Sequence, residues 1–191
     1  KVQAFLGDIR QPKSIEKAFR NIDVVFHGAA LKHVELGELN PSEIISTNIL
    51  GTENVVESAL RNNVKKLIFM SSDKAVNPTN LMGASKLFGE KISKSFSNSS
   101  SGSMLITTRF GNVLGSSGSA LIKFIKQIKG NLPVTLTSKR MTRFIMTKKE
   151  AINLLLDSCE KGGNGDTFVS KMSAVSIYDL ILALYSLIEI A

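Results

Sequence analysis

Short apolar runs alternate with longer segments of helical spacing along most of the chain. The apolar runs lie at residues 2–6, 23–30, 65–72 and 103–113. They are almost continuous, which is typical of strands that are buried on both faces of a parallel sheet. The pattern therefore predicts an α/β fold in which helices cover both sides of the sheet.

The clearest helical segment begins at Asn40-Pro41, where an N-cap residue precedes a proline at the first helical position. Glu43 could complete a capping box there. Apolar residues then recur on one face until about residue 60, and a second helix is predicted over about residues 80–96. Strand, helix and strand in this order form a right-handed crossover. We expect a doubly wound parallel sheet with ligand loops at the carboxyl ends of its strands.

The alternation becomes looser after residue 113. A turn rich in glycine and serine leads into an amphipathic helix, and a short strand is predicted at residues 132–137. An arginine-rich turn at residues 140–147 precedes a helix over residues 149–160. This part of the chain is typical of a smaller region appended to the main sheet.

The charge of the chain favours an anionic small substrate. The formal net charge is +8, but aromatic residues make up only 6% and the lysines are scattered. Nucleic-acid surfaces usually combine a basic groove with aromatic stacking platforms, so we expect no nucleic acid as partner. The single cysteine, Cys159, excludes an internal disulfide, and its helical surroundings favour a packed thiol.

No apolar run is long enough to span a bilayer. We therefore expect no membrane in this segment and a cytoplasmic location. Because the chain begins at Lys1 inside an apolar run, we expect it to be part of a longer protein. That longer protein could itself be membrane-anchored.

The residues with reactive side chains gather between positions 70 and 86. Ser72-Asp73-Lys74 ends a predicted strand, and Met82 and Lys86 share one face of the following helix. Both sets could meet in one crevice, although Asp73 could equally cap the loop and Lys86 could be a surface lysine. A methionine cannot transfer a proton, so any base must come from the other groups.

The two histidines suggest no metal site. His27 lies inside an apolar strand and is expected in the core, whereas His33 could either approach a substrate or be structural. They are far apart and lack carboxylates at ligand spacing, so we expect no bound metal.

The chain resembles the CapD-type polysaccharide-biosynthesis family, in the UDP-N-acetylglucosamine 4,6-dehydratase branch of the extended short-chain dehydrogenase/reductases. The segments that carry the resemblance are LGDIR (6–10), FHGAALKHVE (26–35), NPSEIISTNILGTENV (40–55), SSDKAVNPTNLMGASK (71–86), RFGNVLGSSGS (109–119) and RMTRFIMT (140–147). The resemblance implies a Rossmann-type sheet. Residues 1–113 would form a partial NAD(P)-binding domain, and residues 114–191 a mainly substrate-binding part interleaved with that sheet.

The resemblance also implies a bound, recycled NAD or NADP. Asp8 would accept a hydrogen bond from the adenine, and Ile9 would lie against its ring. Ala29 and Ala30 would let the cofactor approach the backbone closely. Asn48 would be a buried polar tie between a helix and the active-site strand. The glycine-rich phosphate loop of the family is missing from this chain, so we expect this segment alone to bind the cofactor poorly.

The catalytic residues are implied in the same way. Lys86 matches the lysine that binds the nicotinamide ribose, and Met82 occupies the position of the usual catalytic tyrosine. In the branch that the chain resembles, methionine also occurs there. The Ser72-Asp73-Lys74 triplet would supply a hydroxyl, an acid and a base. The residues that would hold the nucleotide diphosphate are Asn112, Arg140 and Arg143.

The implied activity is dehydration of UDP-N-acetylglucosamine, with or without inversion at carbon 5, by a homo-oligomer that makes surface-glycan precursors. A UDP-sugar 4-epimerase is the nearest alternative, because it shares the oxidation at carbon 4 but needs no acid–base pair for elimination. A non-catalytic nucleotide-binding regulator is the other alternative, and Met82 is the feature that favours it.

Overall fold

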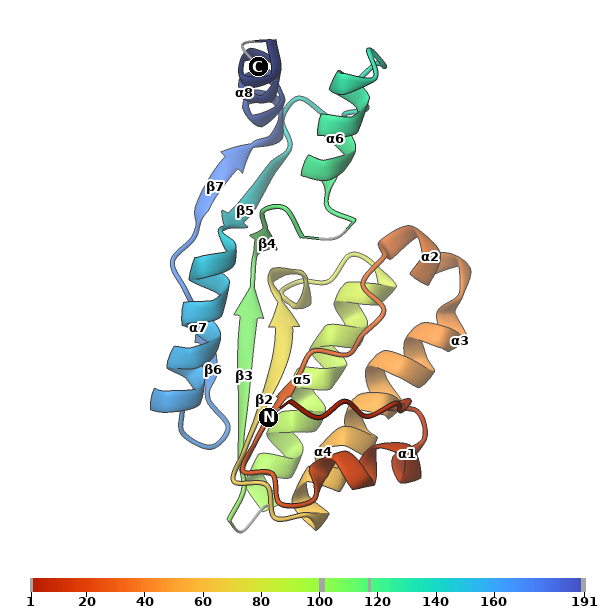
Figure 1. Cartoon of the computed structure of the whole chain (residues 1–191), viewed down its shortest axis with the longest axis vertical. Helices are drawn as coiled ribbons and strands as arrows, with labels where there is room; N and C mark the ends of the chain where they lie inside the picture. The colour runs from red at the N-terminus through yellow and green to blue at the C-terminus, as the bar shows by residue number, and fades with distance from the viewer. Residues whose placement is uncertain (1, 100–101, 117, 190–191) are drawn as a thin grey trace. The chain divides into compact units, whose positions relative to one another are not determined.

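The structure is a computed structural model that describes residues 2–99, 102–116 and 118–189. The chain forms two compact units, one of residues 1–109 and 154–169 and the other of residues 110–153 and 170–191. Strands β1-β2-β3-β6 form a four-stranded sheet, and strands β4-β5-β7 form a three-stranded sheet (Figure 1). The predicted α/β class is confirmed. The division into cofactor-binding and substrate-binding parts stays a prediction.

Parallel strands form the sheet of the first unit. Its strands are β1 (Val24–His27), β2 (Lys66–Ser72), β3 (Met104–Phe110) and β6 (Thr167–Val169). β1 pairs with β2 and β3 pairs with β6, both in parallel. Its helical elements are α1 (Pro12–Glu16), η1 (Lys17–Phe19), α2 (Val34–Leu39), α3 (Pro41–Ile44), η2 (Ile45–Leu50), α4 (Gly51–Arg61), η3 (Asp73–Ala75), α5 (Leu81–Ser99) and the second half of α7 (Lys148–Lys161).

Alternate residues of β2 and β3 face different helices, because side chains of a strand point to opposite faces in turn. Leu67, Phe69 and Leu105 are buried in one cluster with α4 and α5. On the other face, Thr108 donates a hydrogen bond to Ser158 of α7 at 2.8 Å. Burial on both faces explains why these strands are almost continuously apolar.

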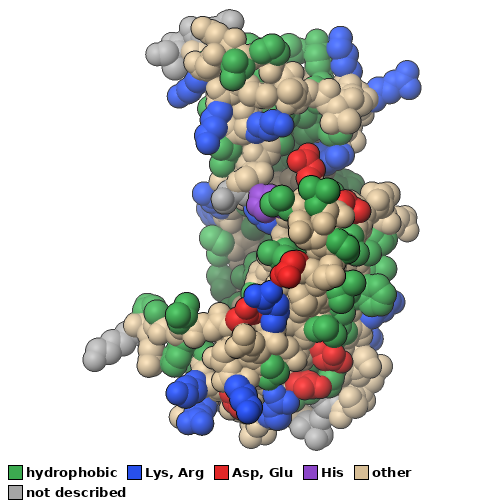
Figure 2. All heavy atoms as spheres, turned by 90° about the vertical axis from the view of Figure 1, so that its right-hand side faces the viewer, with side chains coloured by type: hydrophobic (Ala, Val, Ile, Leu, Met, Phe, Trp, Pro, Cys, Tyr) green, Lys and Arg blue, Asp and Glu red, His purple; other side chains and the backbone are tan. Residues whose placement is uncertain are grey.

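The outer surface of the helical layer is mixed. Figure 2 shows acidic and basic side chains interspersed with hydrophobic ones on this side of the molecule. Leu36 and Leu39 of α2 are among the exposed apolar side chains. Most charged residues of this layer therefore act as a solvated surface.

The predicted helix over residues 40–61 is present but is not regular. It consists of α3, the π-helical turn η2 and α4. The predicted capping box is wrong: the Asn40 amide donates back to the Leu36 carbonyl at 2.9 Å, and Glu43 accepts from Arg10 at 2.9 Å. A guanidinium donor gives a stronger, charge-assisted hydrogen bond than a backbone amide, which explains why Glu43 binds Arg10 and does not cap the helix.

The predicted strand at residues 2–6 is not formed, and Val2 and Leu6 are fully exposed. No described strand pairs with these residues, and an extended segment needs a neighbour to take its backbone hydrogen bonds. The predicted strand at residues 132–137 is also wrong. That segment is irregular, and its Val134 and Leu136 pack against an apolar cluster of the second unit instead.

The second unit is built on β4 (Asn112–Val113), β5 (Thr142–Met146) and β7 (Ser173–Ser176), with α6 (Ala120–Lys129) and α8 (Ile177–Glu189). β5 pairs in parallel with β4 and antiparallel with β7. The predicted arginine-rich turn is thus mainly a strand, because residues 142–146 find partners on both sides. Phe124 and Ile128 of α6 pack with Ile181 of α8 to form the core of this unit.

Candidate active site

The predicted Ser72-Asp73-Lys74 triplet forms one hydrogen-bonded cluster at the carboxyl end of β2. The Ser72 hydroxyl donates to Asp73 Oδ1 at 2.9 Å and accepts from the Lys74 backbone N–H at 3.2 Å. The Lys74 ammonium lies 3.0 Å from the same Asp73 oxygen. The single turn η3 thus presents a hydroxyl, a carboxylate and an amine side by side. Asp73 is 16% exposed and Lys74 33% exposed, so the pair is only partly shielded from water.

Lys86 lies on the buried face of α5, together with Met82. Its ammonium donates to the Met70 carbonyl of β2 at 2.8 Å and lies 4.9 Å from the centre of the Phe69 ring. Burial lowers the pKa of Lys86 to about 8, and the nearby Glu90 carboxylate opposes this shift. Lys86 is therefore not a surface lysine but a buried cation near the carboxyl end of β2.

Close packing of α5 against η3 brings these groups to the same end of the sheet. A Cβ at Gly83 would come within 2.5 Å of the Lys74 carbonyl oxygen, so only glycine allows this approach. The Asn80 side chain accepts from the Gly83 backbone N–H at 2.9 Å and caps the start of the helix. These contacts fix the start of α5 against η3. The helix face that carries Met82 and Lys86 therefore lies beside the Ser72-Asp73-Lys74 cluster.

Asn48 connects the loop after β1 to α5. It is 2% exposed and lies in the π-helical turn η2. Its side chain accepts from the Leu31 backbone N–H at 2.8 Å and donates to the Leu31 carbonyl and to Ser85, both at 2.9 Å. The loop held in this way also contains Ala29 and Ala30, whose small side chains follow Gly28 after the carboxyl end of β1.

Asp8 and Ile9 lie near the start of α4. The Asp8 carboxylate accepts hydrogen bonds from the Arg10 guanidinium, at 2.7 Å from Nη2, and these bonds lower the pKa of Asp8. Ile9 packs against Gly51, and its carbonyl accepts from Asn54 at 2.9 Å. Asp8 is therefore a partly exposed anion, and each of its oxygens accepts two hydrogen bonds from Arg10.

The two histidines differ in burial. His27 is 4% exposed, and burial together with the Lys86 cation lowers its pKa to about 3. Its Nε2 lies 3.1 Å from the Thr52 hydroxyl, which gives its own proton to the Asn48 carbonyl at 2.7 Å. His27 must therefore be neutral, with its proton on Nε2. His33 is exposed at the start of α2.

The second unit carries the remaining predicted residues. Asn112 of β4 is paired with Ile145 of β5, and Arg143 lies two residues before Ile145. Side chains two residues apart leave the same face of a strand, so Asn112 and Arg143 share one face of this sheet. The Asn112 amide also donates to the Phe144 carbonyl at 2.8 Å. Arg140 lies in the exposed turn before β5.

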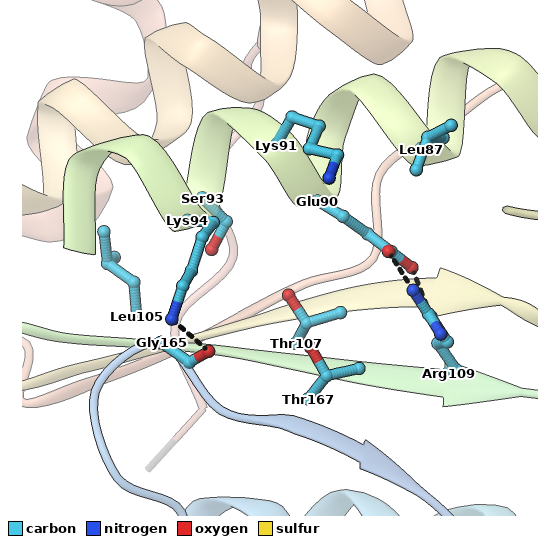
Figure 3. Close-up of a pocket in the computed structure, with 10 residues that line it drawn as sticks. All are labelled: Leu87, Glu90, Lys91, Ser93, Lys94, Leu105, Thr107, Arg109, Gly165 and Thr167. Carbon is cyan, nitrogen blue, oxygen red and sulfur yellow. Dashed lines mark hydrogen bonds and ion pairs between the residues drawn. The ribbon is translucent and has the colours of Figure 1, made fainter. Parts of the chain in front are cut away.

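One buried ionic group was missed by the sequence analysis. Glu90 of α5 binds Ser71 of β2. It also binds Arg109 of β3 (Figure 3). The spacing of Lys86 and Glu90, one helical turn apart, is visible in the sequence and could have indicated a charged pair. Nothing local links Glu90 to Arg109, which is 19 residues further along.

Comparison with known proteins places the chain in a family. The sequence profile of the family described as polysaccharide biosynthesis protein matches residues 1–191, the whole chain. The chain belongs to this CapD-type family. The resemblance to this family is thus confirmed, whereas the UDP-N-acetylglucosamine 4,6-dehydratase branch stays a prediction.

Curated members of the family differ in their names. An uncharacterised membrane protein of Methanocaldococcus jannaschii is 47% identical over 183 residues, which are 95% of this chain and 55% of that protein. A UDP-glucose 4-epimerase of Rickettsia canadensis is 45% identical over 186 residues, which are 96% of this chain and 54% of that protein. The chain thus spans about half the length of these relatives. Within the described residues, no helix is long and apolar enough to cross a membrane.

Solved structures share the fold. Pen from Bacillus thuringiensis is 41% identical with a TM-score of 0.94, over 98% of this chain and 60% of that one. DesIV, a dTDP-glucose 4,6-dehydratase from Streptomyces venezuelae with NAD and TYD bound, has a TM-score of 0.87 over 96% of this chain and 62% of that one. The identity to DesIV is only 18%, so that likeness shows the fold alone.

Proposed function

We propose that this chain is part of an NAD(P)-dependent UDP-N-acetylglucosamine 4,6-dehydratase, a cytoplasmic enzyme that makes surface-polysaccharide precursors. The observation that carries the proposal is the Ser72-Asp73-Lys74 cluster at the carboxyl end of β2, next to the Lys86 face of α5. Membership of the polysaccharide biosynthesis family supports the same class. The proposed activity is that of the whole protein, because related proteins are about twice as long as this chain.

The described residues fit a nicotinamide dinucleotide. An ammonium has three protons, and one of those of Lys86 is used on the Met70 carbonyl, so donors remain for the ribose hydroxyls. The Asp8 carboxylate would accept from the adenine amino group in place of one of its bonds from Arg10, and Ala29 and Ala30 would leave room beside the backbone. Asn48 would hold their loop in place. When bound, the cofactor would accept a hydride from carbon 4 of the sugar and return it at carbon 6.

The elimination between these hydride transfers needs an acid and a base. In this proposal the Lys74 ammonium first passes a proton to the Asp73 carboxylate, which lies 3.0 Å away. Neutral Lys74 then takes the proton from carbon 5, and protonated Asp73 gives its proton to the departing 6-hydroxyl, which leaves as water. Ser72 orients the Asp73 carboxylate through its 2.9 Å hydrogen bond. Met82 cannot accept the proton of the 4-hydroxyl, so that proton passes to a neighbouring group, Asp73, Lys74 or a water bound to Lys86.

The second unit would hold the nucleotide diphosphate. Guanidinium groups bind phosphate oxygens in bidentate fashion, and Arg143 shares one sheet face with the amide of Asn112. Arg140 lies three residues before Arg143 and adds a second cation. These three residues therefore support a UDP-sugar as substrate.

A UDP-sugar 4-epimerase is the second candidate, and the names of the Rickettsia relatives favour it. Both reactions begin with oxidation at carbon 4, for which Lys86 and the cofactor residues would serve equally. Only the dehydratase must remove a proton from carbon 5 and protonate the 6-hydroxyl. The Asp73–Lys74 pair is the feature that favours dehydration.

The deciding experiment replaces Lys74 by alanine in the full-length protein. We expect formation of the 4-keto-6-deoxy sugar to fall by about 10²- to 10⁴-fold, the usual effect of losing a general base. Hydride exchange at carbon 4 should fall much less. Product that the wild-type protein forms in heavy water should carry deuterium at carbon 5.

Lys65→Ala is the matched control, because Lys65 is an exposed lysine of the same unit, paired with Asp23. It should leave the rate unchanged. If the wild-type protein converted the substrate into its 4-epimer and made no 4-keto-6-deoxy sugar, the epimerase assignment would replace ours. Nucleotide binding without either product would favour the regulator.

A further inference from the structure

Glu90 is a buried carboxylate for which the proposed reaction has no direct use. It is 7% exposed and lies on α5 one turn after Lys86. It accepts a hydrogen bond from the Ser71 hydroxyl at 2.6 Å. It also accepts from Arg109 Nε at 2.8 Å and from Arg109 Nη2 at 2.6 Å (Figure 3). Short, charge-assisted and bidentate bonds of this kind are among the strongest in proteins.

These bonds hold α5 to the ends of two strands. Ser71 and Arg109 point toward α5 because they occupy alternate positions with Phe69 and Leu105, which face the same helix. Ser71 directly precedes the Ser72-Asp73-Lys74 cluster. Glu90 therefore links the helix that carries Lys86 to the strand that carries the proposed acid and base.

The charge of Glu90 also faces the Lys86 ammonium. Two other titratable groups adjoin this pair: the neutral His27 from β1, whose pKa Lys86 helps to lower, and Arg109 from β3, which binds Glu90. The Asp73–Lys74 pair lies on η3, which packs against α5. Arg109 forms an ion pair with Glu90, but its side chain is 27% exposed. It lines a hollow of about 220 Å³ together with Lys91, Lys94 and Thr107 (Figure 3). Glu90 is thus an anion next to Lys86 and away from water, and it opposes the effect of burial on that lysine.

We propose that Glu90 is a positioning residue of the reaction, which fixes Lys86 relative to Ser72-Asp73-Lys74 through Ser71 and Arg109 and keeps the Lys86 ammonium charged. The inference rests on the proposed function for its effect on catalysis. Its effect on Lys86 itself can be measured without any reaction.

The test is Glu90→Gln in the full-length protein, since glutamine keeps the shape and removes the charge. The titration of Lys86 is followed by ¹³Cε-lysine NMR of the cofactor-free protein, with the resonance assigned by Lys86→Arg. We expect the Lys86 titration and the alkaline limb of kcat to move down by about one pH unit, and KM for the UDP-sugar to change less than about twofold. The control is Asp157→Asn, which removes a carboxylate from the exposed pair with Lys161.

Ser71→Ala tests the positioning of α5 separately from the charge of Glu90, because it removes one hydrogen bond to Glu90 and leaves the carboxylate in place. Since it removes only a hydroxyl, it can also be measured if Glu90→Gln does not fold. It should lower kcat about tenfold by loosening α5, without moving the alkaline limb. If the pH at which Lys86 titrates is the same in Glu90→Gln as in the wild type, Glu90 does not keep Lys86 charged. If kcat of Ser71→Ala equals that of the wild type, the hydrogen bond from Ser71 does not position Lys86 for the reaction. If the titration moves but the protein makes no 4-keto-6-deoxy sugar, the proposed function fails while the effect of Glu90 on Lys86 stands.

Discussion

Lys86 carries a charge that destabilises the folded chain, and its replacement by methionine should make the protein more stable. The side chain is 8% exposed, and burial lowers its pKa from 10.5 to about 8. Methionine is unbranched and apolar, and it adapts well to the space of a buried lysine stem. Phe69, over which the ammonium lies, would accept a thioether equally well.

The size of the effect follows from the pKa difference. Each unit corresponds to about 1.4 kcal/mol, so keeping Lys86 charged in the folded state costs about 3 kcal/mol near pH 7. Loss of the hydrogen bond to the Met70 carbonyl offsets about 1 kcal/mol of this gain. We expect Lys86→Met to raise the free energy of unfolding by about 2 kcal/mol near pH 7 and to abolish the proposed activity.

The pH dependence gives the stricter test. The unfolded lysine keeps its proton up to its ordinary pKa of 10.5, whereas the folded one begins to lose it near pH 8. The unfolded state therefore binds more protons between these values, and the wild-type protein should gain stability relative to Lys86→Met as the pH rises from 8 to 10.5. The advantage of Lys86→Met should therefore disappear within this window.

The assay is urea unfolding of the full-length, cofactor-free protein at several pH values, followed by a spectroscopic probe of the sheet. Lys161→Met is the control, because Asp157 raises the pKa of that exposed lysine and places its titration above the window. Parallel stability curves of wild type and Lys86→Met between pH 8 and 10.5 would refute the reasoning.

Three further predictions concern other parts of the structure. The wild-type protein should lose stability as the pH falls from 6.5 toward 3, because His27 binds a proton in the unfolded state in this range, whereas burial lowers its pKa to about 3 in the folded state. His27→Gln should lessen this loss. Gly89→Ala places a methyl group against the Phe69 ring and should lower the free energy of unfolding by about 1–3 kcal/mol, whereas Ser95→Ala on the exposed side of α5 should change it little. Arg143→Lys should raise KM for the UDP-sugar about tenfold, since an ammonium cannot form the bidentate contact.

Each of these predictions has a clear contrary outcome. An acid-stability curve that His27→Gln leaves unchanged would mean that the ring is protonated within the fold. A Gly89→Ala protein as stable as wild type would mean that Phe69 moves aside freely. An unaltered KM in Arg143→Lys would remove that residue from the diphosphate site. The first two are read from urea midpoints and the third from initial rates.

The sheet and its helices were largely predictable because burial on both faces leaves a strong mark on the sequence. The runs around Leu67 and Leu105 are continuously apolar, and both became central strands. The triplet Ser72-Asp73-Lys74 follows such a run directly, so its place at the carboxyl end of a strand could be expected. Local spacing also indicated correctly that Met82 and Lys86 share a helix face.

The failures have a common cause, which is dependence on distant partners. Residues 2–6 have the composition of a strand but no described neighbour to pair with, whereas Thr142–Met146 resembles a turn and finds neighbours on both sides. Glu43 could have capped its helix but binds Arg10 instead. The link between Glu90 and Arg109 depends on two elements meeting in space, which no local pattern records.

The choice between dehydratase and epimerase depends on very few residues. Lys86, Asn48 and the loop after β1 would serve the oxidation at carbon 4, which both reactions share, so these features do not separate the two activities. Only a group that acts at carbon 5 or on the 6-hydroxyl distinguishes the two reactions. Asp73 and Lys74, which lie 3.0 Å from each other, are the groups to which we assign this proton transfer. For this reason a variant of Lys74 can decide the question, whereas a variant of Lys86 would abolish both activities alike.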